Sequence, residues 1–162
     1  MVIIGQVGCY PSCSMNIESI LAASRTFCNI EATSKKRAIE KAAILIAESL
    51  PLLDSSEVYN KLIAREKLGP TALGNGIALP HCRLEGCTEI VGALFTLETP
   101  IDFSAMDDLP VNIMFILMVP EQEVDKHLKT MAMLAALFES EEYRKGLISA
   151  RHNQELFERA LL

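Results

Sequence analysis

Hydrophobic positions along this chain follow two different spacings. Residues 35–50 place apolar side chains every three or four positions, which predicts an amphipathic helix that Thr33 or Ser34 caps and Pro51 ends. Residues 111–119 are apolar at odd and even positions alike, as expected for a strand covered on both faces. Helices are also predicted over residues 16–23, 56–68, 121–138, 140–149 and 153–161, strands over 27–32, 77–79 and 90–97, and a loop over 98–102. This mixture indicates an α/β layered domain.

Composition narrows the class of protein. The chain has 162 residues, of which 50% are hydrophobic, and this is enough material for one domain with a single core. The formal net charge of -6 disfavours nucleic acid as a partner, because phosphate neutralisation requires a basic face. The longest apolar runs fall short of the ~20 residues that span a bilayer, so we expect no membrane insertion.

The N-terminus and the cysteines indicate a cytoplasmic protein. The first residues lack the basic and apolar regions of a secretory signal. The five cysteines are odd in number and follow no disulfide framework, so we interpret them as reduced thiols. We interpret residues 1–14 as a poorly ordered N-terminal extension, with Met15 as an alternative start, and residues 15–162 as the folded domain.

The strongest candidate for chemistry is His81. It follows a turn-rich run over residues 69–76, the short apolar strand 77–79, and Pro80, which cannot donate to a sheet and so marks a strand end or an edge. A histidine at that point can be held in one orientation with one ring nitrogen reachable. Imidazole is largely neutral near pH 7 and is nucleophilic in that form. The alternative is an ordinary core or surface histidine.

Arg65 is the second candidate. It shares one face of the predicted helix with Val58 and Leu62, and the helix leads directly into the turn before His81. An arginine at the end of an apolar stripe often extends its guanidinium into water, and this is the simpler interpretation. The alternative is a guanidinium that leans inward to bind an anion.

His127 is the third candidate, early in the predicted helix 121–138. It is either a surface histidine or a second imidazole that faces His81 across a pocket. Cys82 and Cys87 add possible metal ligands, but they match no established zinc spacing, and we predict no metal. The residues alone leave a phosphoryl carrier, a hydrolase and a binding module open.

Residues 65–81 nevertheless form a long motif, Arg-Glu-x-Leu-Gly-x-Thr-x-x-Gly-Asn-Gly-Ile-Ala-x-Pro-His. It resembles the signature of the enzyme IIA domains (type 2) of the mannitol/fructose class in the bacterial phosphotransferase system. Further similarity to that family lies at residues 34–38, 97–101, 119–120 and 126–128. In its single-domain length and in the sequence of residues 74–78, the chain is most similar to the nitrogen-related, regulatory enzyme IIA.

The resemblance implies a three-layer α/β/α sandwich with a mixed central sheet of about four to five strands. It also implies that His81 accepts a phosphoryl group from a small phosphocarrier protein of the HPr/NPr type, with Arg65 and His127 at the active site and no cofactor. The regulated partners would be transporters or sensor kinases. The implied phosphoryl-pocket loop consists of Thr71, Gly74, Asn75 and Gly76.

Two alternatives to the nitrogen regulator remain. One is a sugar-specific enzyme IIA that passes phosphate to a IIB domain, and the other is an anion- or metal-binding module. The sequence also differs from the common family pattern: Pro70 stands where a small polar residue is usual, and Cys82-Arg83 stands where Gly-Lys is usual. Neither difference removes a functional side chain, but Cys82 would add an oxidisable neighbour to the acceptor.

Overall fold

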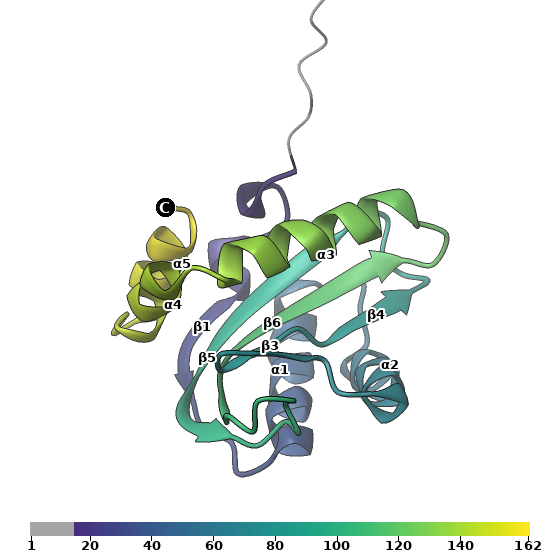
Figure 1. Cartoon of the computed structure of the whole chain (residues 1–162). Helices are drawn as coiled ribbons and strands as arrows, with labels where there is room; N and C mark the ends of the chain where they lie inside the picture. The colour runs from purple at the N-terminus through teal and green to yellow at the C-terminus, as the bar shows by residue number, and fades with distance from the viewer. Residues whose placement is uncertain (1–14) are drawn as a thin grey trace, which may run out of the picture.

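The computed structural model describes residues 15–162, so the prediction for residues 1–14 lies outside the described residues. A mixed six-stranded sheet with the order β1-β5-β6-β3-β2, and with β4 also paired to β6, forms the central layer (Figure 1). The strands are β1 Thr26–Ile30, β2 Ala72–Gly74, β3 Ile77–Ala78, β4 His81–Leu84, β5 Val91–Ile101 and β6 Val111–Pro120. The helices are α1 Lys35–Ser49, α2 Ser55–Leu68, α3 Asp125–Phe138, α4 Glu141–Ile148 and α5 Asn153–Ala160.

Helices cover both faces of this sheet. One hydrophobic cluster joins α1 and α2 to one face, and a second joins α3, α4 and α5 to the other. In Figure 1 α3 lies across the sheet on the side away from α1 and α2. The predicted three-layer α/β/α sandwich is therefore confirmed, and the sheet has six strands rather than four to five because the short segments β2 and β4 also pair.

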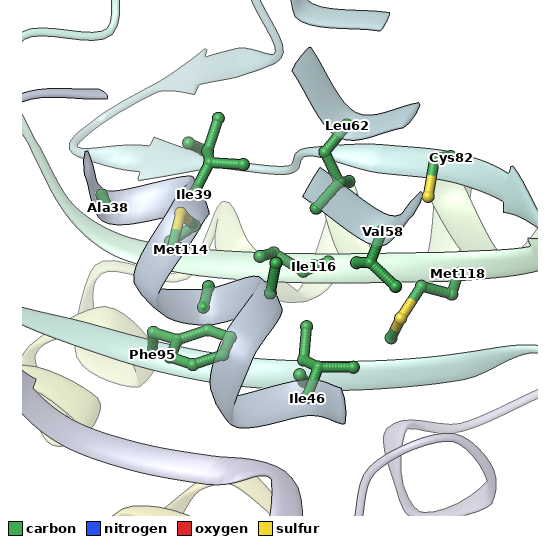
Figure 2. Packing of buried hydrophobic residues seen from close by; sticks show 14 of the residues in the cluster. Ala38, Ile39, Ile46, Val58, Leu62, Cys82, Phe95, Met114, Ile116 and Met118 are labelled. Atoms are coloured by element: carbon green, nitrogen blue, oxygen red, sulfur yellow. The ribbon is translucent and has the colours of Figure 1, made fainter. Parts of the chain in front are cut away.

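Strand β6 is the centre of the core, because its side chains alternate between the two clusters. Met114, Ile116 and Met118 face α1 and α2. Figure 2 shows Met114 beside Ile39, and Ile116 and Met118 near Val58. The residues between them belong to the cluster beneath α3. The prediction of a strand covered on both faces is confirmed.

Three predicted boundaries were wrong. A loop was expected over residues 98–102, but strand β5 continues as far as Ile101, because a register shift after Thr96 lets Ile101 pair with Val111. The expected helix over residues 16–23 consists of two short 3-10 turns, Ile17–Ser19 and Ala23–Arg25. The helix expected from residue 121 begins at Asp125, and its preceding residues form a turn.

Strands β3 and β4 run along the same edge of β6 and are separated by Leu79 and Pro80. Both pair in parallel with β6, with Ile77 opposite Ile113 and His81 opposite Leu117. Pro80 has no N–H, but its carbonyl accepts a hydrogen bond from Leu117 at 3.0 Å. The predicted strand end at Pro80 is thus an interruption, and His81 opens the strand that follows it.

Across residues 15–162, no helix is both long enough and apolar enough to cross a bilayer.

We expect Gly92→Ala to destabilise the fold by about 1–3 kcal/mol, because overpacking a close-packed core costs that much. A Cβ atom at Gly92 would lie 2.6 Å from Cζ of the Phe115 ring, which is fully buried. Urea unfolding followed by circular dichroism measures the change.

Gly146→Ala is the matched control. A Cβ atom at Gly146, in helix α4, has no neighbour within 4 Å, so this substitution should stabilise the protein by about 0.5–1 kcal/mol through helix propensity. Equal effects of the two substitutions would contradict the packing described here.

Candidate active site

The His81 ring is oriented by a hydrogen bond to a backbone carbonyl nearby in the chain. Nδ1 lies 2.9 Å from the carbonyl oxygen of Leu79, two residues earlier. Because a carbonyl oxygen only accepts hydrogen bonds, Nδ1 must be the protonated nitrogen of the neutral ring. The other ring nitrogen, Nε2, therefore carries the free lone pair. His81 is half-buried, as the first residue of β4.

Arg65 lies directly beside that lone pair. It occupies the last turn of α2, where Nε donates to His81 Nε2 at 3.3 Å and Nη1 donates to the carbonyl of Gly69 at 3.0 Å. The end of α2 therefore points a cation at the histidine, and a cation near a helix C-terminus is electrostatically favourable. The structure brings these two predicted site residues together.

The surroundings of His81 favour its neutral form. Its pKa is lowered, chiefly because burial disfavours the charged ring, and the Arg65 and Arg83 guanidinium groups lower it further. The Leu79 carbonyl and the Glu66 carboxylate act in the opposite direction but are outweighed. A neutral ring with a bare Nε2 is the nucleophilic form of histidine.

The loop that leads to His81 is braced by a buried carboxylate. Glu66, 7% exposed, accepts hydrogen bonds from the backbone N–H of Thr71 at 3.1 Å and from its hydroxyl at 2.6 Å. Lys35 Nζ lies 3.3 Å from the same carboxylate, so the buried charge is paired. The Thr71 carbonyl in turn accepts from the N–H of Leu79 at 3.0 Å. Thr71 therefore supports the segment that orients His81.

A second imidazole completes the site. His127, in the first turn of α3, has its ring centroid 5.6 Å from that of His81, with the ring planes at 63°. Its Nδ1 lies 3.2 Å from Nη2 of Arg83, while its Nε2 is buried and has no hydrogen-bond partner among residues 15–162. Burial lowers the pKa of His127, and the charges of His81 and Arg83 lower it further.

The glycine-rich turn lies elsewhere. Gly74, Asn75 and Gly76 all have positive φ and connect β2 to β3, and the Asn75 N–H donates to Asp107 Oδ2 at 2.8 Å. His81 follows Ile77 by four residues along the same sheet edge, which places this turn roughly 13 Å or more from His81 at strand spacing. The structure does not bring these three residues to the histidines, and their evident role is to make the turn.

Strand alternation separates the two residues after His81. Cys82 points to the opposite face, where Figure 2 shows it near Leu62 in the core, and burial raises the pKa of its thiol to about 12. The expectation that Cys82 adjoins the acceptor is therefore wrong. Arg83 returns to the His81 face and contacts His127. Arg83 is therefore a site residue that our sequence reasoning did not select. The i, i+2 spacing on one strand was the available signal.

Among the residues that the structure describes, no three His, Cys, Asp or Glu side chains are grouped so that they could hold a metal ion.

Together, fold and site define an α/β/α domain organised around a neutral histidine that a fixed cation flanks. The chain belongs to the family described as "Phosphoenolpyruvate-dependent sugar phosphotransferase system, EIIA 2", which its residues 19–160 match. It is 41% identical over 144 residues to the nitrogen regulatory protein of Pseudomonas aeruginosa, covering 89% of this chain and 94% of that protein.

Solved structures agree with this assignment. The nitrogen regulatory protein IIA-Ntr of Neisseria meningitidis superimposes with a TM-score of 0.81 at 37% identity, over 89% of this chain and 98% of that one. The IIA mannitol protein of Escherichia coli shares the fold, with a TM-score of 0.72 at 21% identity over 86% of this chain and 98% of that one. The expected family is confirmed.

We expect His81 to titrate below 6.5, the ordinary value for histidine, and Arg65→Ala to move its midpoint upward. Burial and the neighbouring cations destabilise the protonated ring, so the neutral form persists to lower pH, and removing one cation reverses part of that effect. An NMR titration of the ring resonances measures both midpoints.

Arg37→Ala is the control for this titration. Arg37 pairs with Glu40 on the exposed surface of α1 and is not one of the described charges that shift the pKa of His81, so its removal should leave the His81 midpoint unchanged. A midpoint above 6.5 in the unsubstituted protein would contradict the geometry.

Proposed function

We propose that this protein is a phosphoryl-accepting regulator of the nitrogen branch of the phosphotransferase system, and that His81 Nε2 is the acceptor atom. The observation that carries the proposal is the Nδ1 contact with Leu79, which leaves Nε2 with the free lone pair beside Arg65. In the transfer, the N–P bond of a carrier's phosphohistidine breaks as the Nε2–P bond forms. The Nδ1 proton stays on the ring throughout.

Arg65 supplies the electrostatic part of the reaction. Phosphoryl transfer demands in-line placement and positive charge near the equatorial oxygens, and it needs little covalent chemistry from the protein. The long 3.3 Å contact between Arg65 Nε and His81 Nε2 is readily exchanged for phosphoryl oxygens when the lone pair attacks. The Gly69 carbonyl keeps the guanidinium in place meanwhile.

The surface around the site fits a protein as the phosphoryl donor. Leu68 ends α2, the helix that carries Arg65, while Val124 and Leu128 lie at the start of α3, near His127. Their exposed fractions are 85%, 55% and 64%, respectively. Large exposed apolar side chains that surround a polar centre are typical of protein-binding surfaces. We therefore infer a small HPr/NPr-type phosphocarrier as the donor. We also infer that the protein acts in the cytoplasm.

Similarity favours the nitrogen branch over the sugar branch. The relatives with the higher identity are nitrogen regulatory proteins, at 41% and 37%. The mannitol protein, at 21% identity, is similar in fold alone. The inferred output is regulation of partner transporters or sensor kinases by the phosphorylation state of His81.

We expect His81→Ala to abolish acid-labile phosphate incorporation from phosphoenolpyruvate, enzyme I and the carrier protein, because the acceptor nitrogen is lost. Mass spectrometry of the intact protein, followed by mapping of the labelled peptide, measures this. Arg65→Ala should still fold but should accept phosphate about a hundredfold more slowly, the usual order of effect for one lost transition-state contact.

His152→Asn provides the matched control, since His152 is the third histidine of the sequence and is not part of the site. Its side chain caps α5 by accepting the Glu155 N–H at 3.2 Å, and asparagine caps helices equally well. This variant should incorporate phosphate normally. Incorporation that persists without His81, or disappears without His152, would refute the assignment.

A second experiment distinguishes the branches. Phosphorylated protein is mixed with a IIB domain of the fructose or mannitol type, and the movement of phosphate is followed over time. We expect the label to remain on His81, because a regulator needs no sugar-specific acceptor. Rapid, complete passage to the IIB domain would instead establish a sugar-specific enzyme IIA.

A further inference from the structure

Arg83 makes an unusual set of contacts next to the two histidines. From β4, its Nη1 donates to the carbonyls of Glu123 at 2.6 Å and Glu121 at 3.0 Å, in the turn that precedes α3. The Pro120 carbonyl lies at 3.5 Å from the same nitrogen. Its Nη2 faces Nδ1 of His127 at 3.2 Å. One planar guanidinium therefore joins the end of the sheet, the turn and the second imidazole.

We propose that Arg83 is a positioning residue, which fixes His127 as the tautomer with its proton on Nε2 and directs that N–H into the phosphoryl site. A guanidinium has five N–H donors and no acceptor, so Nδ1 of His127 can only accept from it. The single proton of the neutral imidazole is then held on Nε2. The inference rests on the proposed function for its catalytic consequence, but the tautomer itself is a property of the unphosphorylated protein.

The unpartnered atom in the site is the one that this tautomer would make a donor. His127 Nε2 is fully buried and has no hydrogen-bond partner within the described part of the chain. A buried donor without an acceptor is unfavourable, and structures satisfy nearly all such groups. The adjoining ring is His81, at a centroid distance of 5.6 Å. Phosphoryl oxygens on His81 Nε2 would supply the missing acceptor, so the donor is satisfied once phosphate arrives.

The dipole of helix α3 does not favour the position of Arg83. It lies at the N-terminal end of α3, where the helix dipole disfavours a cation. It also lowers the pKa of His127, and so opposes protonation of the ring. The charged or titratable groups that act on His127 are Arg83 and His81, both from β4. Burial and these neighbouring charges together favour the neutral form of His127.

The test compares Arg83→Met and Arg83→Lys with the unsubstituted protein. Nitrogen-15 NMR of the His127 ring, without phosphate and at a pH where both histidines are neutral, reports the tautomer. We expect Nε2–H alone in the native ring. In Arg83→Met we expect an admixture of Nδ1–H and a raised His127 titration midpoint. Arg83→Lys, which keeps a cationic donor group but loses the planar guanidinium, should be intermediate.

Transfer kinetics form the second readout. Arg83→Met should lower the maximal rate of phosphate acceptance from the carrier about tenfold, less than outright loss of a donor costs, because the ring still samples the productive tautomer. The KM for the carrier should be unchanged, since Arg83 acts through His127 inside the site. A change confined to KM would overturn the proposal.

Arg144→Met is the matched control. Arg144 Nη1 donates to the carbonyls of Phe138 at 2.7 Å and Glu139 at 2.9 Å, at the other end of α3, and within residues 15–162 it makes no hydrogen bond to a histidine. If Arg83 only clamped carbonyls, both substitutions would slow transfer alike and leave the His127 ring unchanged, and the proposal would fail. If the native protein shows the tautomer but no phosphate reaches His81, the proposed function fails while the role of Arg83 in holding His127 stands.

Discussion

The site depends on one hydrogen bond, which the His81 Nδ1–H donates to the carbonyl of Leu79. That bond decides which ring nitrogen is free, and it exists because the sheet edge is interrupted at Pro80, where β3 ends and β4 has not begun. Two hydrogen-bonded contacts stabilise this interruption: Leu79 donates to the carbonyl of Thr71, and Thr71 donates to the carboxylate of Glu66. An ion pair between the buried Glu66 and the partly exposed Lys35 completes the support, so the orientation of one imidazole rests on residues from α1, α2 and the segments next to β2 and β3.

Neutrality is the second constraint on the site. Two imidazoles and two guanidinium groups lie close together, and the pKa of each imidazole is lowered, first by burial and then by its charged neighbours. Among the described residues, Glu66 is the one carboxylate whose charge raises the pKa of His81. Such a cluster suits the proposed phosphoryl transfer, because grouped cations are complementary to a dianion and the lowered pKa keeps the proposed acceptor ring unprotonated.

Most of the fold was predictable from local pattern. The helical spacing of residues 35–50 and the two-sided apolar run of β6 were confirmed, because each reflects burial that recurs within a single element. The continuation of β5 past Pro100 was not predictable, since the partner that pairs with Ile101 is Val111, and a strand-ending residue is tolerated at an irregularity in the ladder. The 3-10 turns near the N-terminus likewise follow from contacts with β5 rather than from helical periodicity.

The sequence by itself determined the family, through the uninterrupted motif over residues 65–81, and it marked Arg65, His81 and His127 as candidates. Only the tertiary structure decided how these residues meet: that Arg65 faces His81 Nε2, that Gly74 to Gly76 lie away from the site, that Cys82 is buried in the core, and that Arg83 reaches His127. The physical reason is that a motif records side chains in chain order, whereas the tautomer, charge and direction of an imidazole depend on atoms that other elements bring within 3–4 Å of it.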